Sequence, residues 1–112
     1  MINSRAKGRR GELEVCRLMG PFWPDACPNL DQFSKDKRDV LNVPGLHVQV
    51  KWNERLRIWE ALDQAFSEAS PLDTPVLAFR RNWTPSPLAS RSCWFGAMDL
   101  EDLLPLLKLR EA

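Results

Sequence analysis

The sequence predicts an α/β domain in which helices flank a mixed β-sheet. Residues Leu46 to Lys51 alternate apolar and polar side chains, as a half-buried strand does. The stretch Val43-Pro44-Gly45 just before them is a turn signal, because proline fixes φ and glycine accepts a positive φ. Apolar residues recur at helical spacing on both sides of this segment. The expected order of helix, two or three strands, helix, two strands and helix favours helices packed on a sheet.

The composition predicts one domain covering residues 1–112, with its positive charge near the front of the chain. The net charge is only +1, yet residues 1–20 carry five basic and two acidic side chains. No apolar run approaches membrane-spanning length, so we expect no membrane partner. Three widely spaced cysteines and one histidine argue against a structural zinc site. The odd cysteine number and the lack of a signal peptide favour a reducing, cytoplasmic setting.

The first helix is expected to begin near the basic, glycine-punctuated opening and to run to about Met19, before Gly20-Pro21. Glu12 falls on the inward stripe of this helix, whereas Glu14 can face water. A carboxylate on the buried side needs a cation, a hydrogen-bond donor or a metal. The basic residues before it either contact phosphate or form a solvated tail.

The remaining elements follow from turn and cap signals. Residues 21–36 read as a loop with a short strand near 29–34, and a hairpin centred on the turn follows. Asn53 is the expected N-cap of a helix that ends near Ser70-Pro71. Strands are expected at 75–80 and 92–98, separated by a loop over 82–91. A last helix is capped by Asp99 with Asp102, and Pro105 is expected to break or kink it.

The hairpin carries a polar group of chemical interest. His47, Gln49 and Lys51 share one face of their strand, and Asp39 begins the strand before it. Carboxylate, amide and backbone oxygens suit Mg²⁺, and a lysine beside them can hold a water or offset charge on a phosphodiester. The plain alternative is a surface ion pair between Asp39 and Lys51 across the hairpin. Histidine at such a strand start is expected to be a surface or edge residue.

Asp39 followed by Gln49-Val50-Lys51 resembles the PD-(D/E)xK nuclease signature, with Gln in the D/E place. The opening Arg5-Ala6-Lys7-Gly8-Arg9-Arg10-Gly11-Glu12 is similar to the first helix of phage and archaeal-type Holliday-junction resolvases, and so is the later Gln64-Ala65 pair. The resemblance covers most of residues 3–81. It implies a restriction-endonuclease-like fold, Mg²⁺ as cofactor (with Mn²⁺ as a substitute), a homodimer, and branched or junction DNA as the partner, in a bacterial or phage-infected host cell.

Carried over by position, the resemblance assigns roles to named residues of this chain. The implied catalytic residues are Glu12, Asp39, Gln49 and Lys51. The implied metal ligands are Glu12, Asp39, Gln49 and the backbone carbonyl of Val50. The implied DNA contacts are Arg5, Lys7, Arg9, Arg10 and Gln64, although Gln64 can equally face solvent between Glu60 and Glu68.

The sequence therefore predicts a metal-dependent, structure-selective DNA endonuclease. Gln49 is its main departure from the signature, because a neutral amide holds a metal less strongly than a carboxylate does. Two alternatives stay open. The first is a catalytically weak or inactive DNA-binding module of the same fold, and the second is a nicking or restriction-type nuclease acting on plain duplex.

Overall fold

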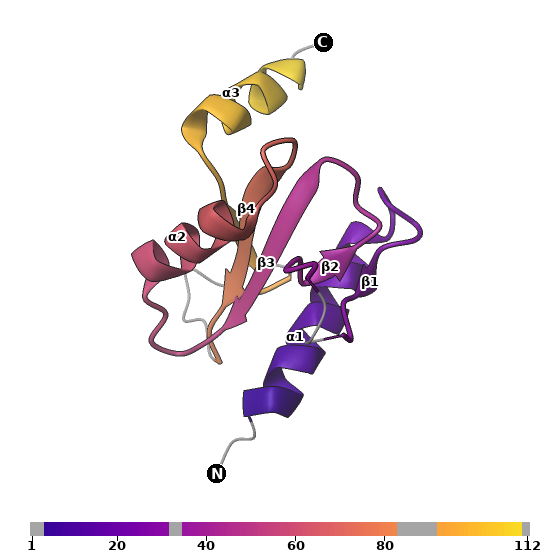
Figure 1. Cartoon of the computed structure of the whole chain (residues 1–112), viewed down its shortest axis with the longest axis vertical. Helices are drawn as coiled ribbons and strands as arrows, with labels where there is room; N and C mark the ends of the chain where they lie inside the picture. Colours follow the sequence, from indigo (N-terminus) through magenta and orange to yellow (C-terminus); the bar gives the residue numbers. More distant parts are fainter. Residues whose placement is uncertain (1–3, 32–34, 83–91, 111–112) are drawn as a thin grey trace.

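A computed structural model describes residues 4–31, 35–82 and 92–110. Within these ranges the chain forms three helices and five strands (Figure 1). In chain order they are α1 (Ser4–Met19), β1 (Cys27–Pro28), β2 (Val40–Leu41), β3 (Leu46–Trp52), α2 (Ile58–Glu68), β4 (Thr74–Arg80), β5 (Phe95–Ala97) and α3 (Leu100–Leu109). The predicted class, an α/β fold with a mixed sheet and flanking helices, is confirmed.

The main sheet has the strand order β3-β4-β5. Strands β3 and β4 are parallel, as expected for strands joined through α2, and β5 runs antiparallel to β4. Strand β3 therefore lies at one edge of this sheet. The short strand β2 pairs with β1 rather than forming a full ladder with β3, so the predicted hairpin is only partly present. The strand expected near 29–34 lies earlier, at β1, and residues 32–34 lie outside the described residues.

The turn before β3 forms as predicted. The amide of Leu46 donates to the carbonyl of Val43 at 3.2 Å, and Gly45 has a φ of 80°. Pro44 occupies the position where a fixed negative φ is required, so this is a type II turn. The turn delivers the chain into β3 directly beside residue Asp39.

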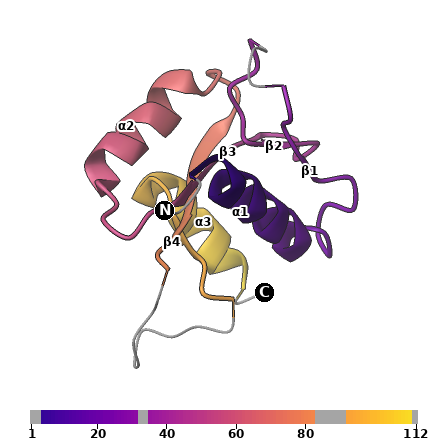
Figure 2. The ribbon, with the colours of Figure 1, turned by 90° about the horizontal axis from the view of Figure 1, so that it is seen from below.

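The two longer helices α1 and α2 cover opposite faces of the sheet (Figure 2). On the α1 face, Val15, Val48 and Trp94 belong to one buried cluster. On the other face, Ala61 and Ala65 of α2 are buried, as is Leu77 of β4. The sequence predicted a half-buried β3, and this is wrong, because a helix covers each face. His47 and Gln49 are consequently only 2% and 4% exposed.

Helix α1 begins at Ser4, so the basic opening is helical rather than a frayed tail. Helix α2 begins at Ile58, later than the predicted cap at Asn53. The side chain of Asn53 instead accepts a hydrogen bond from the amide of Arg55 at 3.1 Å, a local turn that competes with helix formation. The helix cap is Arg57, which makes no side-chain cap bond.

The C-terminal region follows the prediction in part. Asp99 caps α3 by accepting from the amide of Glu101 at 2.8 Å. The helix continues through Pro105, however, because its missing N–H leaves a carbonyl that water can reach on this exposed helix. Strand β5 is shorter than expected, and residues 83–91 of the predicted loop lie outside the described part. None of the helices found in the described ranges has both the length and the apolar character needed to span a bilayer.

Candidate active site

Asp39 is fixed at the free edge of β3 by three short hydrogen bonds. Its amide donates to the carbonyl of Val48 at 3.0 Å, and its carbonyl accepts from the amide of Asn29 at 3.0 Å. Its carboxylate oxygen Oδ2 accepts from the amide of Val50 at 2.7 Å. Because both backbone and side chain are tied, the carboxylate has a defined position beside β3.

The same bonds orient the backbone of Val50. The N–H and C=O groups of one strand residue project to the same edge. Since the Val50 amide points to Asp39 rather than to β4, the Val50 carbonyl projects from this edge as well. The backbone oxygen that the resemblance implies as a metal ligand therefore lies next to the Asp39 carboxylate.

A cavity of about 310 Å³ is lined by three of the four implied metal ligands, Glu12, Asp39 and Gln49. Glu12 reaches it from α1, Asp39 and Gln49 from the edge of β3, and Gln64 from α2. The other lining residues are Asn29, Asp31, Asp36, Lys37, Arg38 and Glu68. Residues far apart in the sequence thus meet where the two helices approach one edge of the sheet.

The carboxylates in this cavity repel one another. Burial, followed by the nearby charge of Asp39, raises the pKa of Glu12 to about 7, against a smaller opposing effect of Arg9. Burial also raises the pKa of Asp39, and the charge of Glu68 adds to that increase. The Val50 amide and the ammonium group of Lys51 act in the opposite direction on the pKa of Asp39. The pair Glu12 and Asp39 is therefore an incompletely neutralised anionic site.

Lys51 lies close enough to Asp39 to stabilise its charge, and it lines an adjoining cavity of about 240 Å³. Gln64 lines both cavities, which are therefore neighbours. Of the predicted group, Glu12 and Asp39 line one cavity, and Lys51 lines the adjoining one, from which its charge acts on Asp39. Gln64 borders these cavities rather than facing bulk solvent alone.

Gln49 is held by His47, which the sequence analysis expected to be a surface or edge residue. Its side-chain oxygen lies 3.3 Å from Nε2 of His47, two residues earlier on the same buried face. An amide oxygen only accepts, so His47 donates from a protonated Nε2 in this arrangement. A carbonyl oxygen has two lone pairs, and Gln49 keeps one for a further partner. Alternation predicted the shared face, but not its burial under α2.

The basic residues of α1 form two stripes. Lys7 and Arg10 lie 5.8 and 5.5 Å from the ring centre of Trp52, at the end of the sheet. Arg9 follows the other stripe, which leads to Glu12. The side chain of Arg5 lies outside the described part of the structure. Among the described basic side chains of α1, Arg9 therefore acts on the cavity, whereas Lys7 and Arg10 lie at Trp52.

The sequence allows Glu14 to face water, but the structure buries most of its side chain. Its side chain is 24% exposed and lies 3.0 Å from Arg80 and 3.1 Å from the indole nitrogen of Trp94. Arg10 approaches its second oxygen at 3.3 Å. The reason is tertiary: β4 and the segment before β5 bring Arg80 and Trp94 against this side of α1.

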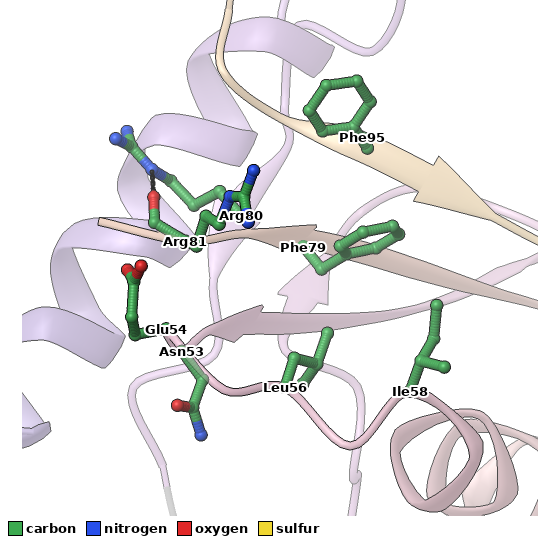
Figure 3. A pocket seen from close by; sticks show the side chains of 8 residues that line it. All are labelled: Asn53, Glu54, Leu56, Ile58, Phe79, Arg80, Arg81 and Phe95. Carbon is green, nitrogen blue, oxygen red and sulfur yellow. Dashed lines mark hydrogen bonds between the residues drawn. The ribbon is translucent and has the colours of Figure 1, made fainter. Parts of the chain in front are cut away.

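A further cavity of about 400 Å³ includes neither Glu12 nor Asp39 in its lining, although Glu54 borders it (Figure 3). Phe79 and Phe95 project into it from neighbouring strands, and Leu56 and Ile58 close it from below in that view. Its walls are mainly apolar, with Arg80 and Arg81 at one end. It offers packing surface and no acid–base group comparable to Glu12 and Asp39.

The donor set of the carboxylate cavity suits a hard divalent cation. No group of three His, Cys, Asp or Glu side chains within the described ranges could hold a metal ion. Two carboxylates, an amide oxygen and an edge carbonyl nevertheless match Mg²⁺, which commonly keeps several waters. Five acidic and two basic side chains line the cavity, and Arg38 is already bound to Asp36 at 2.6 Å. That ion pair lowers the pKa of Asp36 to about 2.

Comparison of the chain with protein-family models, with curated proteins and with solved structures gives no match. The assignment of a function therefore depends on the geometry of the site and on the sequence motif.

Proposed function

We propose that the chain is a metal-dependent endonuclease of the PD-(D/E)xK superfamily, with a restriction-endonuclease-like fold, that cleaves branched DNA as Holliday-junction resolvases do. One observation carries the proposal. Glu12, Asp39 and Gln49 line a single cavity although they come from separate parts of the chain, and Lys51 acts electrostatically on Asp39. A surface ion pair across a hairpin would not require Glu12 at the same place.

In this proposal the side chains of Glu12, Asp39 and Gln49 and the carbonyl of Val50 hold Mg²⁺, for which Mn²⁺ can substitute. When bound, the cation supplies Lewis-acid polarisation of the phosphodiester and a more acidic water. The ammonium group of Lys51 positions the attacking water and stabilises negative charge that develops on the phosphoryl oxygens. The fixed Asp39 carboxylate keeps this arrangement ordered before DNA arrives.

The basic stripes of α1 supply the contacts to DNA. The charge of Arg9 acts on Glu12 in the cavity, and Lys7 and Arg10 add positive charge further along the described part of the helix. Such contacts to phosphate orient the duplex arms without reading their sequence. Cutting two strands of a junction requires two sites, so the proposal includes a homodimer with C₂ symmetry. Exposed apolar side chains such as Trp59, which is 79% exposed, suit such an interface.

The test is incubation with a labelled four-way junction, a linear duplex and a single strand, each with Mg²⁺, Mn²⁺ or a chelator. We expect metal-dependent cleavage of the junction, and a loss of about 100-fold or more in Lys51→Ala. Lys35→Ala, which removes an exposed lysine that lines neither cavity, is the matched control. Activity that survives Lys51→Ala unchanged would remove the mechanism. Preferential cleavage of the plain duplex would select the nicking or restriction-type alternative.

A second candidate function is favoured by Gln49. A neutral residue at this position reduces the charge that holds a cation, which fits a junction-binding module with a decayed site. In that case the wild-type chain binds junctions without cutting them, and Gln49→Glu gains metal-dependent cleavage. Cleavage by the wild-type chain decides against this candidate.

A further inference from the structure

Glu68 lines the same cavity as Glu12 and Asp39, but it arrives from the opposite face of the sheet. It lies in the last turn of α2, whereas Glu12 belongs to α1. From the sequence, Glu68 was expected only to be a neighbour of Gln64 on α2. It is the one acidic side chain that α2 contributes to the lining of this cavity.

Glu68 is oriented by its own helix. The side-chain amide nitrogen Nε2 of Gln64, one turn earlier, donates to Oε1 of Glu68 at 3.3 Å. Both side chains are partly buried, and both border the cavity. Other carboxylates of α2 lie differently, since Glu60 pairs with Arg57 in solvent and Asp63 is exposed. The position of Glu68 is thus specific to the side of α2 that faces Asp39.

The charge of Glu68 acts on the site. It contributes to the raised pKa of Asp39, so the two carboxylates are close enough to repel. No ion pair among the described residues includes Glu68. Bringing a further anion to an already acidic cavity is unfavourable unless a cation compensates for it.

The proposed metal site lacks one negative charge, because residue 49 is neutral. Gln49 stands where the nuclease signature has a carboxylate, and its oxygen already accepts from His47. Glu12, Asp39 and Glu68 do not make a direct group of three ligands. Mg²⁺ retains waters that carboxylates can accept from, so Glu68 is suited to act through water.

We propose that Glu68 supplies, through bound water, the negative charge toward a divalent cation that Gln49 lacks, with Gln64 holding its carboxylate in place. This inference rests on the proposed function, since it concerns the same site. It makes Glu68 a positioning residue for the cation and its water shell, and it explains how the site tolerates an amide at position 49.

The experiment is a titration of the full chain with Mn²⁺, followed by calorimetry and by the electron paramagnetic resonance of the free ion. Glu68→Gln is expected to weaken Mn²⁺ binding by about 10-fold or more, as loss of an outer-shell partner does. Glu68→Asp keeps the charge and should retain more affinity than Glu68→Gln. Asp63→Asn, on the exposed side of α2, is the control and should leave the Kd unchanged. Gln64→Ala, which removes the hydrogen bond to Glu68, should also weaken Mn²⁺ binding.

The decisive comparison uses the Gln49→Glu background. There a carboxylate stands in the signature position, so adding Glu68→Gln should cost much less affinity than it does in the wild-type chain. Equal losses in both backgrounds, or no loss in folded Glu68→Gln, would overturn the role of Glu68 while leaving junction cleavage and the proposed function intact. Absence of Mn²⁺ binding by the wild-type chain would overturn both.

Discussion

Two carboxylates of α1, only two residues apart, have opposite surroundings. Glu14 meets Arg80, the Trp94 indole and Arg10, which together neutralise it and complete its hydrogen bonds. Glu12 instead shares a cavity with Asp39, and burial and repulsion raise its pKa to about 7. The first arrangement stabilises the fold. The second leaves charge unbalanced at a fixed position, as expected of a site prepared for a cation or a reaction.

The comparison predicts opposite stability effects at the two positions, and this is the largest expected difference. Glu14→Gln leaves the partly buried Arg80 without its anion and should lower the free energy of unfolding by about 1–3 kcal/mol. Glu12→Gln removes a buried charge and its repulsion with Asp39, so it should raise the free energy of unfolding at neutral pH. Urea denaturation measures both.

The control for Glu14 is Glu60→Gln, because the ion pair of Glu60 with Arg57 is exposed on both sides. An exposed pair should change the free energy of unfolding by less than about 1 kcal/mol. A loss in Glu12→Gln as large as that in Glu14→Gln would break the distinction between a neutralised and an unbalanced carboxylate.

The pH dependence of the stability gives a second test of the surroundings of Glu12. The pKa of Glu12 rises from its ordinary value of 4.5 to about 7, so between these values the folded state binds more protons than the unfolded state. The stability of the metal-free chain should therefore fall as pH rises from about 4.5 to 7, and Glu12→Gln should flatten this slope. Asp39 acts in the same direction, because its pKa is also raised.

Asp36 should change the stability in the opposite direction and over a lower pH range, because its pKa is lowered. Its pKa is lowered to about 2, so its stabilising effect is present above its ordinary value of 3.8 and is lost as pH falls toward 2. Thermal melts over pH 2 to 8 separate the two effects. A metal-free chain whose stability rises steadily from pH 4.5 to 7 would contradict the account of Glu12.

The smallest expected effect concerns the packing of α1 against Trp52 and Trp94, on the side of the helix where Glu14 is neutralised. A Cβ at Gly11 would lie 3.2 Å from Cη2 of Trp94 and 3.4 Å from Cε3 of Trp52, whereas one at Gly8 meets nothing within 4 Å. Gly8→Ala should stabilise the helix by up to about 1 kcal/mol. Gly11→Ala should gain less or lose stability, because the two rings must move. An equal rise in melting temperature for Gly8→Ala and Gly11→Ala would argue against close packing of α1 on Trp52 and Trp94.

Local sequence patterns predicted the elements that local chemistry determines. The turn at Pro44-Gly45, the cap at Asp99 and the inward direction of Glu12 depend on dihedral preference, one side chain and helical period. Alternation in β3 showed which residues share a face. It could not show that α2 would cover that face and bury His47 and Gln49.

The residues missed by sequence analysis depend on tertiary contacts. Glu14 became half-buried because Arg80 and Trp94, distant in sequence, pack against α1. Glu68 joined the cavity because α2 docks with that side toward Asp39. A helical stripe of Gln64 and Glu68 was visible in the sequence, but the same spacing describes a solvated face equally well.

The most direct test of the central claim is an anomalous difference map from a crystal of the wild-type chain soaked in Mn²⁺. The account predicts one strong peak in the cavity at the free edge of β3, in contact with the carboxylates of Glu12 and Asp39 and facing the carbonyl of Val50. A fully soaked crystal with no peak there, or with Mn²⁺ bound only at other carboxylates, would contradict it.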